Sequence, residues 1–158
     1  MNLKQNLEKI QNSEVFKKWN KNNAFLVSCF FLDNMWQFDF YSKKTKKISS
    51  FSLEGNSVKI IEEESAVFQK EQRDLEELDL DKIKIKLEET IKIIDKIKRE
   101  MVPSETVSKR IIILQKINVP LWNISYITSA FNLLNIKVNA INSEIIEKNF
   151  DSIISFKK

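Results

Sequence analysis

Four lysines stand within five residues of the chain, and their side chains are the ones best suited to bind an anionic ligand. They are Lys43, Lys44, Lys46 and Lys47. Lysine ammonium groups bind phosphates, and Phe40 and Tyr41 beside them would supply rings on which a base can stack. The alternative is a lysine-rich turn that keeps a sheet from pairing with neighbouring molecules. We expect this second role, and we keep the four lysines as candidate phosphate contacts.

The sequence lacks the residue types that most catalytic and cofactor-binding sites require. The sequence contains no histidine, 1 cysteine and 1 glycine. Without histidine, the usual general base and any Ser-His or Cys-His pair are missing. A single cysteine cannot build a zinc or iron–sulfur framework, and the phosphate-binding loops of nucleotide enzymes require several glycines. We therefore expect a protein that is not an enzyme, with no catalytic residues, no metal and no cofactor.

Other charged clusters are explained more simply as solvated surface. The adjacent residues Glu62–Glu64 would alternate between the two faces of a strand, so their carboxylates would not converge on a cation. Lys84, Lys86, Lys92 and Lys96 fit the wet face of a helix better than a reactive lysine. These residues are not candidates for a site.

Several features indicate the cytosol. No stretch of sequence reaches the roughly 18 apolar residues that a membrane-spanning helix requires. The N-terminal segment carries Glu8 and Glu14 where a signal peptide would have an apolar core. Cys29 lies in an apolar run and is typical of a small buried hydrophobe in a reducing compartment. We expect a cytoplasmic protein without membrane contact.

The N-terminal part of the sequence predicts helix followed by strands. Apolar residues on one helical face predict a broken or continuous helix from about Leu3 to Asn20, with Asn2 and Ser13 as caps. Residues 24–32 form an apolar run typical of a buried strand, and residues 36–41 alternate as in a half-buried strand. Strands over 47–53 and 58–62 follow, separated by a turn at Gly55.

An acidic stretch divides the chain. Residues 61–90 contain 5 Lys+Arg against 11 Asp+Glu, whereas the sequence on either side is basic. We interpret residues 64–80 as a surface connector with a helical piece around 65–73. The longest helix is expected from about Asp81 to Met101, although the alternation from Ile83 to Leu87 also permits a strand.

The last third predicts strands over 110–117, 121–128 and 133–141, then a short strand after Ser143 and a helical C-terminus. Trp122, Ile124 and Tyr126 share one face of the second of these strands. The fold class is therefore α+β, with an antiparallel sheet on which a long central helix and an N-terminal helix pack.

Two domain organisations are open. The chain is either a single α+β domain over 1–158 or two pseudo-repeated halves, 1–63 and 81–158, joined by the acidic connector. The order of helix and strands occurs twice. Positions 97 apart match weakly, as Phe25 does with Trp122 and Val27 with Ile124.

The hairpins near the C-terminus resemble a PepSY-type domain. A strand bearing Trp122 is followed by one that ends in Asn139–Ser143, where that family has an Asp-Ala-Lys-Thr-Gly turn and a short return strand. Residues 41–48 are similar to a second, degenerate copy, which would make a tandem pair. The resemblance implies a cystatin-like fold, with a helix packed on an antiparallel sheet, and a non-catalytic role in binding or restraining other proteins. It brings no catalytic residues.

The sequence therefore favours a small non-enzymatic cytoplasmic protein that binds another protein or a second copy of itself. Exposed sheet edges and the amphipathic helix are the expected contact surfaces. The alternative is a nucleic-acid or ribonucleoprotein-associated protein that uses the turn from Lys43 to Lys47. The two differ in their response to salt, because phosphate binding weakens steeply as salt rises.

Overall fold

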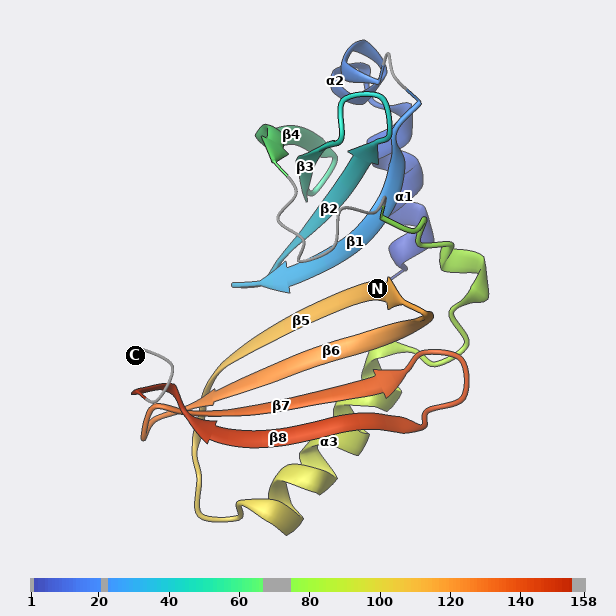
Figure 1. Ribbon diagram of the computed structural model, residues 1–158. Helices are drawn as coiled ribbons and strands as arrows, with labels where there is room; N and C mark the ends of the chain where they lie inside the picture. Colours follow the sequence, from blue (N-terminus) through green and yellow to red (C-terminus); the bar gives the residue numbers. More distant parts are fainter. Residues whose placement is uncertain (1, 21–22, 67–74, 155–158) are drawn as a thin grey trace. The chain divides into compact units, whose positions relative to one another are not determined.

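The computed structural model describes residues 2–20, 23–66 and 75–154 (Figure 1). The chain divides into two compact units, Met1–Leu80 and Asp81–Lys158, here called the N-terminal and C-terminal units. In each unit, helix is followed by four antiparallel strands that pair in chain order. The predicted α+β class with antiparallel sheet is confirmed.

The N-terminal unit begins with two short helices that break where the sequence provides a second cap. The Asn2 side chain accepts a hydrogen bond from the Gln5 amide at 3.2 Å, and the Ser13 hydroxyl accepts one from the Phe16 amide at 3.2 Å. Both predicted caps are confirmed. The elements are α1 (Leu3–Asn12), α2 (Glu14–Trp19), β1 (Phe25–Leu32), β2 (Met35–Ser42), β3 (Lys47–Glu54) and β4 (Ser57–Ala66).

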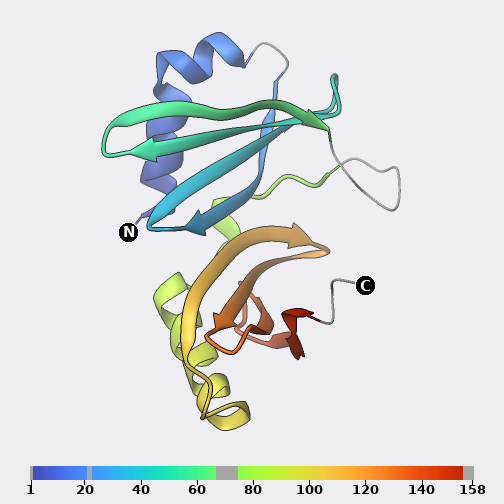
Figure 2. The ribbon, with the colours of Figure 1, turned by 90° about the vertical axis from the view of Figure 1, so that its left-hand side faces the viewer.

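Aromatic rings join these helices to one face of the sheet. The Phe16 ring lies 4.7 Å from that of Phe40 and 5.3 Å from that of Phe51, and the Trp19 ring lies 5.0 Å from that of Phe51. Such ring pairs add to the free energy of burial. Figure 2 shows α1 and α2 on the same side of the β1–β4 sheet.

The C-terminal unit has one long helix on its sheet. Ile94 and Ile97 of this helix are buried, and the Tyr126 hydroxyl donates a hydrogen bond to Asp95 at 2.7 Å. Figure 1 shows the helix against one face of the sheet. The elements are η1 (Leu80–Lys82, beginning at the unit boundary), α3 (Leu87–Met101), β5 (Val107–Ile117), β6 (Val119–Thr128), β7 (Asn132–Asn139) and β8 (Ile145–Ser152).

The long helix begins later than the sequence predicts, at Leu87 and not at Asp81. The amides of Lys84 and Ile85 both donate to the Ala140 carbonyl at 2.9 Å, and the Ile85 carbonyl accepts from Trp122 Nε1 at 2.9 Å. These bonds hold residues 84 and 85 outside the helix. At these two residues the tertiary hydrogen bonds outweigh the intrinsic helical propensity of the sequence.

The predicted connector is partly strand and partly core. β4 continues to Ala66, so the helix expected over 65–73 is wrong at its first two residues, and residues 67–74 lie outside the described chain. Leu78 and Leu80 are buried, and the Leu78 amide donates to the Leu26 carbonyl at 2.8 Å. Residues 78 and 80 therefore belong to the fold and are not surface linker.

Two further expectations are corrected. The segment from Ile145 to Ser152 is a strand throughout, so a helix does not begin there. The internal repeat predicted between positions 97 apart is also wrong. It aligns Phe25, in the first strand of the N-terminal unit, with Trp122, in the second strand of the C-terminal unit. Strand order instead matches Trp36 of β2 with Trp122 of β6. The origin of the two units by duplication stays a prediction.

The β7–β8 turn offers a stability test. Ser143 has φ 64°, a left-handed conformation that favours glycine. We expect Ser143→Gly to raise the free energy of unfolding by about 0.5–1 kcal/mol, because the relief of strain outweighs the added freedom of the unfolded chain. Denaturant titration measures the change. The reciprocal variant, Gly55→Ala at φ 60°, should destabilise by a similar amount, and an unchanged or lower stability for Ser143→Gly would contradict the argument.

Candidate functional site

The four candidate lysines lie on the turn that joins β2 to β3 and at the start of β3. All four are exposed, and Lys46 has φ 56°, so the backbone turns sharply there. The chain closes this turn through the Lys46 amide, which donates to the Ser42 carbonyl at 2.7 Å. The position on a turn agrees with the sequence-based expectation.

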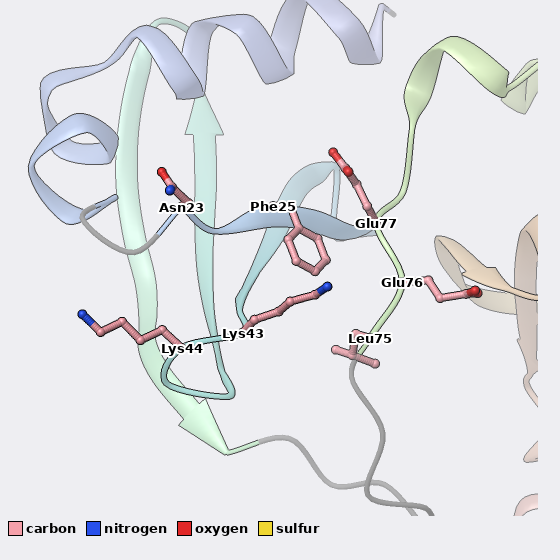
Figure 3. Close-up of a pocket in the computed structure, with 7 residues that line it drawn as sticks. All are labelled: Asn23, Phe25, Lys43, Lys44, Leu75, Glu76 and Glu77. Atoms are coloured by element: carbon pink, nitrogen blue, oxygen red, sulfur yellow. The ribbon is translucent and has the colours of Figure 1, made fainter.

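A hollow of about 680 Å³ opens beside this turn, and it receives only two of the four lysines (Figure 3). Lys43 Nζ lies 5.9 Å from the centre of the Phe25 ring, close enough for a cation–π contact. Glu76 and Glu77 also line the hollow, and the Glu76 side chain points away from Lys43. The lining residues are Asn23, Phe25, Lys43, Lys44, Leu75, Glu76 and Glu77, so the hollow has mixed charge and would repel part of a polyanion.

β8 is an edge strand. It pairs with β7 and, in the part of the chain that the structure describes, with no strand on its other side within the C-terminal unit. Ile145 is 42% exposed and Ile146 is 47% exposed. Glu147 is held in place by Lys137, whose ammonium lies 2.8 Å from its carboxylate and lowers its pKa. The outer side of β8 therefore pairs with no other described strand of this unit and is flanked by apolar and charged side chains.

The sheet face opposite the helices is polar in both units. In the N-terminal unit the Asp39 carboxylate accepts hydrogen bonds from Ser28 at 2.7 Å, Ser50 at 2.6 Å and Gln37 at 2.8 Å. In the C-terminal unit Asn135 donates to Asn123 at 2.7 Å and to Ser125 at 2.9 Å. These cross-strand networks are satisfied internally, which is typical of structural polar groups.

Cys29 and Tyr126 are poorly suited to act as nucleophiles. Burial, reinforced by the nearby Asp39 charge, raises the pKa of the Cys29 thiol, so the reactive thiolate is disfavoured. Burial and the hydrogen bond to Asp95 raise the pKa of Tyr126. The Arg110 guanidinium carbon lies 5.1 Å from the centre of the Tyr126 ring, and a guanidinium nitrogen lies 3.8 Å from Asp95 Oδ1. Tyr126, Asp95 and Arg110 therefore form one cluster with a structural role.

Neither metal ligation nor a membrane span is evident in the described residues. Among residues 2–20, 23–66 and 75–154, no group of three or more His, Cys, Asp or Glu side chains lies close enough together to hold an ion. No helix in the same residues is long and apolar enough to cross a membrane.

Sequence reasoning missed the Asp39 network and the contact between Ile85 and Trp122. Both depend on cross-strand register and on chain segments far apart in sequence. One signal was present: Gln37 and Asp39 alternate with Trp36 and Phe38, just as Asn123 and Ser125 alternate with Trp122 and Ile124.

Comparisons with known proteins show the fold alone. The sequence matches no protein-family model, and a comparison with curated proteins finds no match. Among solved structures, a "putative lipoprotein" from Clostridium difficile 630 aligns with a TM-score of 0.57 over 87% of this chain and 88% of that chain. Their sequences are 17% identical, so the similarity concerns chain path and carries no function.

Proposed function

We propose that the chain is a small non-enzymatic cytoplasmic module that binds other proteins. The observation that carries this proposal is the open edge of β8, with Ile145 and Ile146 exposed along it. An extended segment of a partner adds to such an edge through backbone hydrogen bonds, and side-chain pockets then give specificity. The partner is another protein or a second copy of this chain.

We also propose that each unit is PepSY-like. Support comes from the helix and four-stranded antiparallel sheet of each unit and from the β7–β8 turn. Asn139 Oδ1 accepts hydrogen bonds from the amides of Ile141 at 2.8 Å and Asn142 at 3.3 Å, as the aspartate usual at this position would do. Ser143, at the position of the usual glycine, has φ 64°.

The test places a charge on the edge strand. We expect Ile146→Lys to reduce partner capture or self-association by at least about tenfold, because a lysine on an edge opposes strand addition. Sedimentation velocity measures self-association, and affinity capture from native lysate followed by mass spectrometry measures the binding of other proteins. Ile141→Lys is the matched control, because Ile141 is also exposed but lies in the turn outside β8. Equal binding by wild type and Ile146→Lys, in both assays, would remove β8 as the contact surface.

The lysine turn supports the second candidate function, nucleic-acid binding, less well. All four lysines are exposed, but Glu76 and Glu77 line the same hollow as Lys43 and Lys44. In the same capture experiment, the variant with Lys43, Lys44, Lys46 and Lys47 changed to Gln should behave as wild type. Submicromolar binding of wild type to single-stranded RNA at low salt, lost in this variant, would reverse the ranking.

A further inference from the structure

The backbone of β8 presents alternate residues to its outer edge (Figure 1). The Ile153 amide donates to the Phe131 carbonyl at 2.9 Å, so these two residues form a hydrogen-bonded pair. Such pairs recur at every second residue of an antiparallel ladder, and the pairs of β7 with Lys148 and Phe150 fall between them. The amides and carbonyls of Lys148 and Phe150 therefore point away from β7.

The side chains of Lys148 and Phe150 lie on the buried face of the sheet. Directly opposed residues of an antiparallel pair share a face. Lys148 opposes Ile136 and Phe150 opposes Leu134, and both of these β7 residues are buried. At this face the edge therefore presents a cation next to a half-buried aromatic ring.

The other face of β8 is acidic. Glu147, Asn149 and Asp151 alternate with the residues of the buried face. Lys137 lies 2.8 Å from the Glu147 carboxylate and offsets its charge, whereas no lysine or arginine of the described residues forms an ion pair with Asp151. Asp151 is therefore the anion of this edge that a partner can pair.

A second copy of the chain fits this edge poorly. Two copies that extend one sheet are related by a two-fold axis perpendicular to it, so residues that oppose each other must come from the same face. The two such registers that pair most of β8 are centred on Lys148 and on Asn149. The first sets Lys148 against its own copy, and the second sets Glu147 against Asp151 twice. Like charges directly opposite each other destabilise a strand pair.

We propose that the β8 edge binds an extended segment of a different protein, added antiparallel, whose charges complement those of β8. The segment places a basic residue opposite Asp151, an apolar residue opposite Phe150 and an acidic residue opposite Lys148. Its C-terminal end is apolar and lies against Ile145 and Ile146, which are exposed. This inference rests on the proposed function and narrows its partner to one class of segment.

The probe is a blocked peptide with this pattern, Lys-Val-Thr-Glu-Thr-Val-Val, titrated to about 5 mM into the full chain labelled with nitrogen-15. We expect solvent exchange of the Lys148 and Phe150 amides to slow by at least about tenfold, the effect of one hydrogen bond each. The amides of Asn149 and Asp151 face β7 and should keep their exchange rates. This alternation along β8 is specific to strand addition.

The control peptide, Glu-Val-Thr-Lys-Thr-Val-Val, has the same composition and net charge. We expect it to bind at least about fivefold more weakly, because both of its charges oppose like charges on β8. The variant Asp151→Lys should bind the two peptides equally, since each then meets one favourable and one unfavourable charge. Glu8→Lys makes the same charge change at an exposed position of α1 and should keep the preference of wild type.

Three results would overturn the inference. Equal affinity of wild type for the two peptides would remove the charge pattern, and unchanged exchange at Lys148 and Phe150 with both would remove the added strand. A wild-type dimer that dissociates in Ile146→Lys would assign the edge to a second copy. Capture with Ile146→Lys assumes nothing about the partner's sequence, so the proposed function can stand when this inference fails.

Discussion

Replacing Trp122 with alanine is expected to lower the free energy of unfolding by about 3–5 kcal/mol, the usual cost of truncating a large buried aromatic side chain. Trp122 is 1% exposed and pairs with Leu114 and Val138 on the neighbouring strands. The substitution leaves a cavity, and it also removes the indole that holds the Ile85 carbonyl. Equilibrium denaturant titration measures the loss. A value below about 1 kcal/mol would mean that Trp122 does not anchor the core.

The hydrogen bond can be separated from the packing by comparing the two tryptophans. Trp122→Phe and Trp36→Phe remove the same atoms from equivalent strands of the two units. Trp122 Nε1 donates to the Ile85 carbonyl, whereas Trp36 Nε1 has no hydrogen-bond partner among the residues that the structure describes. We expect Trp122→Phe to cost about 1–3 kcal/mol more, because the Ile85 carbonyl loses its partner. Equal losses in the two variants would show that the hydrogen bond adds nothing to stability.

Strands were predictable where one face is buried and the other is not. Trp36, Phe38 and Phe40 are buried and the residues between them are half-buried, which is the two-residue period that the sequence displays. The helix caps at Asn2 and Ser13 were predictable because side-chain capping is local.

The start of α3 was not predictable because local sequence is ambiguous there. Ile83, Ile85 and Leu87 fit a strand period, and Ile83 and Leu87 also fit a helical face. Hydrogen bonds to Trp122 and Ala140, far along the chain, decide between the two.

The candidate site was predictable only in part. Four lysines between two strands were sufficient to place a basic turn. Glu76 and Glu77 line the same hollow because the chain returns beside β1, where the Leu78 amide donates a hydrogen bond to the Leu26 carbonyl. The lack of a hydrogen-bond partner for Trp36 Nε1 within residues 2–20, 23–66 and 75–154 is likewise a tertiary property, since the sequence shows the residue and not its surroundings.

The Asp39 network carries the second large expected effect. The Asp39 carboxylate accepts three hydrogen bonds, from Ser28, Gln37 and Ser50, so one residue ties together β1, β2 and β3. Asp39→Ala would leave the buried Ser50 hydroxyl without this acceptor. Hydrogen bonds to a charged acceptor are each worth about 1.5–3 kcal/mol, and part of that is offset because water can reach the half-buried site. We expect Asp39→Ala to lower the free energy of unfolding by about 2–4 kcal/mol, measured by urea titration.

The matched variant Asp39→Asn separates the hydrogen bonds from the charge. An asparagine retains one acceptor oxygen for Gln37 and Ser50, and its amide can donate to the Ser28 hydroxyl, which is able to accept. It therefore preserves the connections between the three strands while removing the charge. We expect this variant to lose less than about 1.5 kcal/mol, since neutral hydrogen bonds are roughly half as strong as charge-assisted ones. If Asp39→Asn were as destabilised as Asp39→Ala, the charge and not the cross-strand network would be the source of the stability. If neither variant lost stability, the polar face would contribute nothing to holding β1, β2 and β3 together.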